Sequence, residues 1–419
     1  MTADATIAVL WVSVTLYAIL GGADFGGGLW DLLAGGTARG RRPRALIDHA
    51  IGPVWETNHV WLIFDLVILW TAFPAAFAAI TSTLFEPLML AVFAIVLRGA
   101  GFAFRKSLRR LPLQALTGGI FAFSSLAAPF FMGAAIGAIA SGQVPAGGGM
   151  DRVASWTGGF PLLTGGLFAG TCAWLAAAYL TVDARHSGLP AMVTYFSRRA
   201  RAAGVVTGLF TAATLADLHV AAPREFTRLT TGPGLPFVIV SAAAVAVVFV
   251  LLATGRTRAV RPFAAAAVTA VIWGWGVAQY PYLLPPSLTI QAGSAPAASL
   301  LSILAIFGIV AATVGPGIVL LFTLRQRGKL HDEDERDVTE ADLPELQAAD
   351  AAASDSAPVP ATAGAGPPRP PAAGDGLRLR ELAIAAVGVL AGAALARRHS
   401  LSPDNENRRH AERPPVRNS

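Results

Sequence analysis

The segment GPVWETNHVWLIFDLVILWTAFP, residues 52–74, carries polar and ionisable side chains inside an otherwise apolar stretch. Its polar members include Glu56, Asn58, His59 and Asp65. An ionised side chain at the centre of a bilayer costs about 2.5–3.5 kcal/mol on insertion scales, so such residues usually face a bundle interior and mark ion or proton pathways. Glu56 and His59 share one helix face because they are three residues apart, whereas Asp65, nine positions past Glu56, faces elsewhere. Glu56 is therefore a candidate proton carrier.

Three more ionisable residues lie in neighbouring apolar segments, namely Asp24 in GGADFGGGLWD, Glu86 in TLFEPLML and Arg98. Two interpretations of the acids are open. In the first, Glu56, with His59 nearby, forms part of a proton path. In the second, the acids pair with Arg98 or with backbone carbonyls and simply hold helices together. The composition favours neither the proton path nor the structural role for Glu56, and it favours the structural role for Asp65 and Glu86.

The apolar segments that carry these residues are long enough to cross a membrane. The chain has 419 residues, of which 54% are hydrophobic and 14% charged, and its mean hydropathy of +0.56 excludes an ordinary soluble domain. A spanning helix needs about 17–25 apolar residues. Stretches of this length lie near residues 5–33, 53–73, 77–102, 113–140, 158–182, 202–219, 234–254, 262–280 and 299–324. We therefore expect an all-α polytopic membrane protein of about nine transmembrane helices packed in bundles.

Basic residues concentrate in every second predicted loop. These loops hold Arg39, Arg41, Arg42, Arg44, Arg105, Lys106, Arg109, Arg110, Arg185, Arg198, Arg199, Arg201, Arg256, Arg258 and Arg261, and Arg325, Arg327 and Lys329 follow the last span. The intervening loops hold only Arg152, Arg224 and Arg228. Under the positive-inside rule, the N-terminus lies outside and the end of the last span in the cytoplasm. The net charge of +6 thus reflects topology, and we expect no nucleic-acid partner.

The two ends of the chain differ in character. No Lys or Arg precedes the first apolar run, which indicates a true spanning helix rather than a cleaved signal peptide. Residues 331–376 are acidic and then Ala/Pro/Gly-rich, which predicts a disordered linker after the membrane domain of residues 1–330. Residues 377–419 hold a short apolar segment, 382–396, and a basic tail. An interfacial helix and a marginal tenth span remain equally open for that segment.

Residues able to ligate a redox centre are scarce in the predicted spans. Of the seven histidines, only His59 lies well inside a span, and only Met89 and Met132 among the methionines do. The single cysteine, Cys172, excludes an internal disulfide and a cysteine-clustered zinc or iron–sulfur site. Because haem iron needs a His, Met, Cys or Tyr ligand, we expect this chain to bind no cofactor and no metal by itself.

Five separated motifs resemble those of cytochrome bd quinol oxidase subunit II. They are ADFGGGLWDL, AIGPVWETNHVWLI, the FP that closes the same span, LRGAGFAFR at 97–105 and QYPYLLPPSLTI at 279–290, and together they cover residues 1 to about 330 in order. The resemblance implies a bacterial plasma-membrane subunit that pairs with a haem-bearing subunit I. That partner would hold b-type and d-type haems, oxidise quinol and reduce oxygen to water. Membrane lipid and quinone are implied as further partners, while the identity of the quinone and a small accessory subunit stay open.

The resemblance also implies roles for single residues. In the family, the acid after the tryptophan of GPxW belongs to a cytoplasmic proton path toward the oxygen-reducing haem, and that residue is Glu56 here. Asp24 matches the acid of the first-helix motif, and Arg98 matches the arginine that ends the third span. The family often has an acid where this chain has Ala103. Asp65, Glu86 and the acidic tail lie outside the family pattern.

Two rival functions compete with this reading. An ion-coupled secondary transporter would place Glu56, Asp24 and Arg98 at a midplane site, but it would favour matching Gly/Pro breaks in two inverted halves, and none is convincing here. A non-catalytic assembly scaffold would use every acid as interhelical glue. It differs from the oxidase reading only at Glu56.

Overall fold

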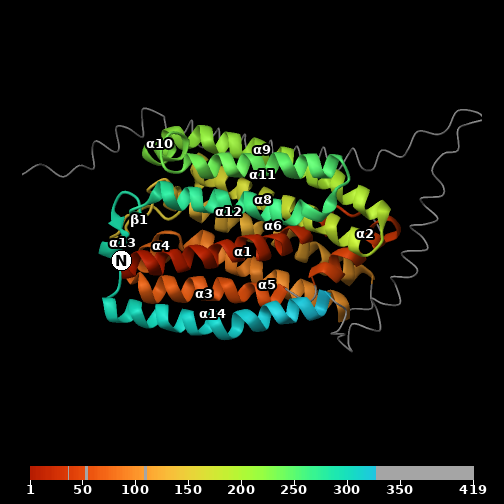
Figure 1. Ribbon diagram of the computed structural model, residues 1–419, viewed down its shortest axis with the longest axis horizontal. Helices are drawn as coiled ribbons and strands as arrows, with labels where there is room; N and C mark the ends of the chain where they lie inside the picture. The colour runs from red at the N-terminus through yellow and green to blue at the C-terminus, as the bar shows by residue number, and fades with distance from the viewer. Residues whose placement is uncertain (36, 52–54, 108–110, 327–419) are drawn as a thin grey trace, which may run out of the picture.

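The computed structural model describes residues 1–326 apart from 36, 52–54 and 108–110, and the predicted linker and tail lie outside this range. The described part is an all-α bundle with one small hairpin (Figure 1). Its long helices are α1 (Thr2–Leu32), α3 (Trp55–Ala72), α5 (Phe85–Ser107), α6 (Leu111–Ala140), α8 (Gly159–His186), α9 (Pro190–Ala221), α11 (Leu235–Ala253), α12 (Val260–Gln279) and α14 (Ala297–Gln326). The all-α membrane fold expected from the sequence is confirmed.

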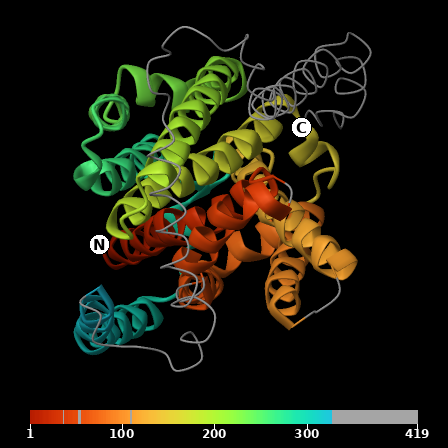
Figure 2. The same ribbon diagram turned by 90° about the vertical axis from the view of Figure 1, so that its right-hand side faces the viewer.

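Helix α1 lies at the centre of the bundle and packs against α3, α6, α8, α12 and α14 (Figures 1 and 2). Its glycine-rich second half stays helical because a lipid-embedded backbone must satisfy its own hydrogen bonds. Glycine also sets how closely neighbours approach, since a Cβ on Gly26 would overlap the Cys172 carbonyl of α8. The central helix therefore presents its polar residues to several neighbours at once.

Each of the nine predicted spans coincides with a long helix, but the boundaries of two of them, the third span and α9, were wrong. The chain bends by 116° where α3 ends and the short helix α4 (Pro74–Thr83) begins, so the segment expected at 77–102 starts as α4 and continues as α5 from Phe85. Proline lacks a backbone N–H and fits the first turn of a new helix. Seven described helices are long and apolar enough to cross a membrane, or eight if the bent pair is one span. The count of nine and the orientation remain predictions.

Two of the predicted basic loops are partly helical. Residues expected to form the first loop make α2 (Thr37–Ile51), and α9 starts at Pro190, so Arg198, Arg199 and Arg201 lie on a helix. Arginine and alanine are good helix formers, which explains the difference. Arg44 of α2 folds back onto the end of α1 and pairs with Asp31 at 3.2 Å.

The opposite end of the bundle is closed by short elements. These are α7 (Ala154–Thr157), α10 (Pro223–Thr230), the antiparallel strands β1 (Tyr282–Leu284) and β2 (Leu288–Thr289), and α13 (Ile290–Gly293). The turn η1 (Thr257–Ala259) lies at the other end of α12, where that helix begins. Helix α12 ends at Gln279, which agrees with the span predicted near residues 262–280. Arg228 of α10 fixes the hairpin entry by donating to the carbonyls of Ala278 and Val277.

Candidate functional site: a buried polar cluster at α1, α3, α5 and α6

Asp24 and Asn58 form the central contact of the site. Asn58 Nδ2 of α3 donates to Asp24 Oδ2 of α1 over 2.5 Å. The two residues are 4% and 5% exposed, respectively, so the bond lies in the protein interior. A buried carboxylate without partners would be strongly destabilising, and the amide satisfies one of its oxygens.

Arg98 of α5 supplies the positive charge of the cluster and is 2% exposed. Its Nε donates to Ser125 Oγ of α6 at 3.1 Å, and that hydroxyl donates to the Phe121 carbonyl at 2.6 Å. The guanidinium also lies over the rings of Phe25 and Phe121, 5.0 and 5.4 Å from their centroids. It is close enough to Asp24 to interact electrostatically, although the two side chains make no direct ion pair among the described residues.

Close packing of α6 against α1 brings the residues of this cluster together. A Cβ on Gly28 would overlap the side chain of Ser125, so only glycine lets α6 approach here. Ser125 can then hold Arg98 against the face of α1 that carries Asp24. The glycine run therefore acts on the site through helix packing, as small residues do in membrane proteins.

His59 lies at the edge of the cluster. Its ring packs against Tyr17 at 6.2 Å and Phe25 at 5.9 Å between centroids. Glu56 lies in the first turn of α3, one turn before His59, but its side chain is outside the described part of the chain. The predicted role of Glu56 therefore stays a prediction.

Asp65 and Glu86 occupy different surroundings. Asp65 shares a face of α3 with Asn58 because seven residues, about two turns, separate them, and Ser13 Oγ of α1 donates to the Trp61 carbonyl of the same helix at 3.4 Å. Glu86 begins α5, twelve residues before Arg98, or roughly 18 Å along the axis, so it is not part of the cluster. Sequence reasoning missed Tyr17, Ser13 and Ser125. No spacing in the sequence distinguishes these three residues from other polar residues.

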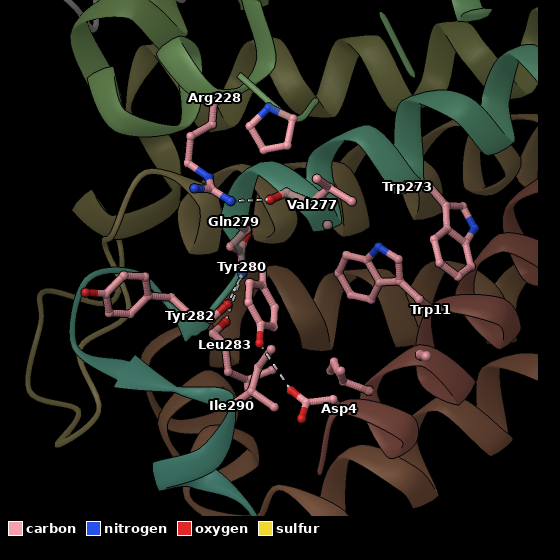
Figure 3. Close-up of a pocket in the computed structure, with 14 residues that line it drawn as sticks. Asp4, Trp11, Arg228, Trp273, Val277, Gln279, Tyr280, Tyr282, Leu283 and Ile290 are labelled. Carbon is pink, nitrogen blue, oxygen red and sulfur yellow. Dashed lines mark hydrogen bonds between the residues drawn. The ribbon is translucent and has the colours of Figure 1, made fainter. Parts of the chain in front are cut away.

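The residues of the site do not fit a haem. In the described ranges no three His, Cys, Asp or Glu side chains gather into a metal-binding group. The half-buried ring of His59 packs against two aromatic rings, and Cys172 is buried where α8 meets α1. A cavity of about 420 Å³ at the other end of the bundle is lined by Asp4, Trp11, Arg228, Trp273, Gln279 and Tyr280 among others (Figure 3).

Comparisons with known proteins identify the family. The family model for cytochrome bd terminal oxidase subunit II matches residues 2–324. The chain is 32% identical over 127 residues to cytochrome bd ubiquinol oxidase subunit 2 of Bacillus subtilis, which is 30% of this chain and 36% of that protein. It is 28% identical over 127 residues to cytochrome bd-I ubiquinol oxidase subunit 2 of Escherichia coli K12, or 30% of this chain and 32% of that one. These alignments span about a third of each relative.

A solved structure shares the fold. The structure of bd oxidase from Geobacillus thermodenitrificans contains a chain that matches with a TM-score of 0.62 and 21% identity, covering 77% of this chain and 98% of that chain. The family match, the motifs in order and the shared fold agree with one another. This integral membrane chain belongs to the cytochrome bd terminal oxidase subunit II family.

Proposed function

We propose that this chain supports quinol oxidation and the reduction of oxygen to water as the second subunit of a complex whose haems lie in subunit I. In this complex the chain contributes a cytoplasmic proton path that starts at Glu56. The observation that carries the proposal is the buried Asp24–Asn58–Arg98 cluster, placed beside the helix turn that holds Glu56. Oxygen reduction to water consumes protons, and proton relays are built from acids facing a bundle interior.

Each residue of the cluster has a distinct task in this proposal. Glu56 takes a proton at the start of α3, and Asp24 is the next acid along the α1–α3 contact. Asn58 fixes the orientation of the Asp24 carboxylate. Arg98 balances the Asp24 charge and is itself positioned by Ser125, so the site stays in place whether or not a proton is present.

The test is oxygen uptake per mole of haem d in the purified two-subunit complex. Glu56→Gln keeps size and hydrogen bonding but cannot carry a proton. We expect it to assemble with normal haem spectra while turnover falls about tenfold or more, which is about 1.4 kcal/mol on the barrier. Glu56→Asp should keep substantial activity. A Gln variant with wild-type turnover per haem d would remove Glu56 from the mechanism.

A further inference from the structure

The end of the bundle at which α14 stops carries exposed arginines. This end also holds α2, the turn between α8 and α9 and the turn between α11 and α12 (Figure 1). Arg198 and Arg201 lie three residues apart on α9 and so share one face of that helix. We call the exposed arginines of these three helix connections the basic end; they are Arg185, Arg198, Arg201, Arg256 and Arg258.

Two acids of the same end are already paired with other arginines. Asp31 pairs with Arg44 at 3.2 Å, and Asp183 pairs with Arg261, which ties the start of α12 to α8. Within the described part of the chain, no arginine of the basic end forms an ion pair. Clustered charges of one sign create a field that attracts molecules of the opposite sign. The basic end therefore fits a polyanion.

A strongly acidic stretch of the chain follows this end directly. Residues 331–350, HDEDERDVTEADLPELQAAD, hold nine Asp or Glu and one arginine, Arg336, so their formal charge is −8 with histidine neutral. We call this stretch the acidic segment. It begins five residues after Gln326, where α14 ends. The acidic segment is therefore tethered to the same end of the bundle as the basic end.

The tether is long enough for the two to meet. An extended chain spans at most about 3.3–3.6 Å per residue, so twenty residues reach up to roughly 70 Å. Packed helices are about 8–10 Å apart, so even five helices lie within roughly 50 Å. A short flexible tether also gives an effective concentration in the millimolar range. Length thus permits docking, and tethering favours it.

We propose that the acidic segment docks on the basic end of the same chain. Arginine and carboxylate groups form paired, parallel hydrogen bonds, which suits the carboxylates of the segment to these guanidinium groups. Single exposed ion pairs contribute little, so docking depends on several pairs acting together and weakens with salt. Docking neutralises the basic end and withholds it from other polyanions. This inference does not depend on the proposed function.

Anionic lipid headgroups are the competing ligand of the basic end. Helix α9 has 32 residues, or about 48 Å, and the hydrocarbon core is only ~30 Å thick, so part of the helix extends beyond it. Arg198 and Arg201 precede the span predicted at 202–219, and Arg256 lies in a turn between spans. The acidic segment offers nine carboxylates on one tether, whereas separate lipids bring their charges one by one. Charge and tethering therefore favour the segment.

The test is photo-crosslinking in the purified two-subunit complex, held in phosphatidylcholine nanodiscs. Thr339, near the middle of the acidic segment, is replaced by p-benzoylphenylalanine, and crosslinked peptides are identified by mass spectrometry. In about 0.01 M salt, where the Debye length is about 30 Å, we expect crosslinks to residues 182–201 and 253–261. In about 1 M salt, where it is about 3 Å, these crosslinks should be lost.

Variants of the segment and of the surface give the controls. Arg198→Gln combined with Arg201→Gln should lower the crosslink yield, whereas Arg152→Gln removes an exposed charge from the other end of the bundle and should leave it unchanged. Oxygen uptake per mole of haem d reports that each variant has assembled. A variant that keeps every arginine should also lose the crosslinks; it combines Asp332→Asn, Glu333→Gln, Asp334→Asn, Glu335→Gln and Asp337→Asn.

The outcomes separate docking from its alternatives. Crosslinks to subunit I, or crosslinks that survive neutralisation of the five acids, would overturn the docking. Crosslinks that vanish when phosphatidylglycerol is added to the nanodiscs would show that anionic lipid holds the basic end in a membrane, and would overturn it as well. A complex without quinol oxidase activity that still gives the salt-sensitive crosslinks would overturn the proposed function and support the docking.

Discussion

Charge balance between Arg98 and Asp24 should dominate the stability of the polar cluster. Both residues are at most 5% exposed, so neither charge can recover hydration when its counterpart is removed. Removing one partner of a buried pair typically costs about 3–5 kcal/mol because it leaves an uncompensated charge. Arg98→Met keeps most of the side-chain volume and removes the charge together with its contacts to Phe25 and Phe121.

A double-mutant cycle measures this coupling. We expect Arg98→Met and Asp24→Asn each to lower the free energy of unfolding by about 3–5 kcal/mol. The double variant should lose clearly less than the sum, because no unpaired charge remains, with a coupling of about 2–3 kcal/mol. Unfolding of the complex by detergent titration, followed by tryptophan fluorescence, gives the three free energies. Additive losses would refute the argument that these two residues compensate each other.

Further predictions concern packing, a turn and the tail. Gly28→Leu should separate α1 from α6 and abolish assembly, whereas Gly118→Ala, which meets no neighbouring atom within 4 Å, should assemble normally; yield of purified complex reports both. Backbone N–H groups of Val153 and Ala154 lower the pKa of Asp151 below its usual 3.8, so this turn should be stabilised above that pH and lose the contribution as pH falls through the lowered value. A fall in the hydrogen-exchange protection factors of the two amides on acidification, absent in Asp151→Asn, checks this. Deletion of residues 335–419 should leave oxygen uptake per haem d largely intact, because the family match ends at 324; a well-assembled truncated complex with little turnover would contradict it.

The amino-acid sequence predicted the class of fold and the position of nearly every long helix. Long apolar runs suffice for this because a bilayer leaves a single chain few ways to satisfy its backbone. The bend at Pro74 and the early start of α9 were missed, since the length of an apolar segment indicates neither the direction of a helix nor whether a flanking basic segment is helical. The five motifs correctly indicated the family.

The candidate site was predicted only in part. Asp24 and Arg98 stood out because charged residues are rare in apolar segments, and the structure places them in one cluster. Their actual hydrogen-bond partners, Asn58 and Ser125, are ordinary polar residues that no spacing rule distinguishes. The partners come from other helices, and the sequence does not state which helices are neighbours.

The sequence by itself therefore determined that this chain spans a membrane, where its helices run and which family it belongs to. Only the tertiary structure decided that Asn58 bonds Asp24 and that Ser125 bonds Arg98, because these contacts depend on how closely the helices pack and on their rotation about their axes. Helical periodicity fixes which residues share a face of one helix. Contact between faces is set by side-chain packing across the whole bundle, such as Gly28 against Ser125, and no single segment contains that information.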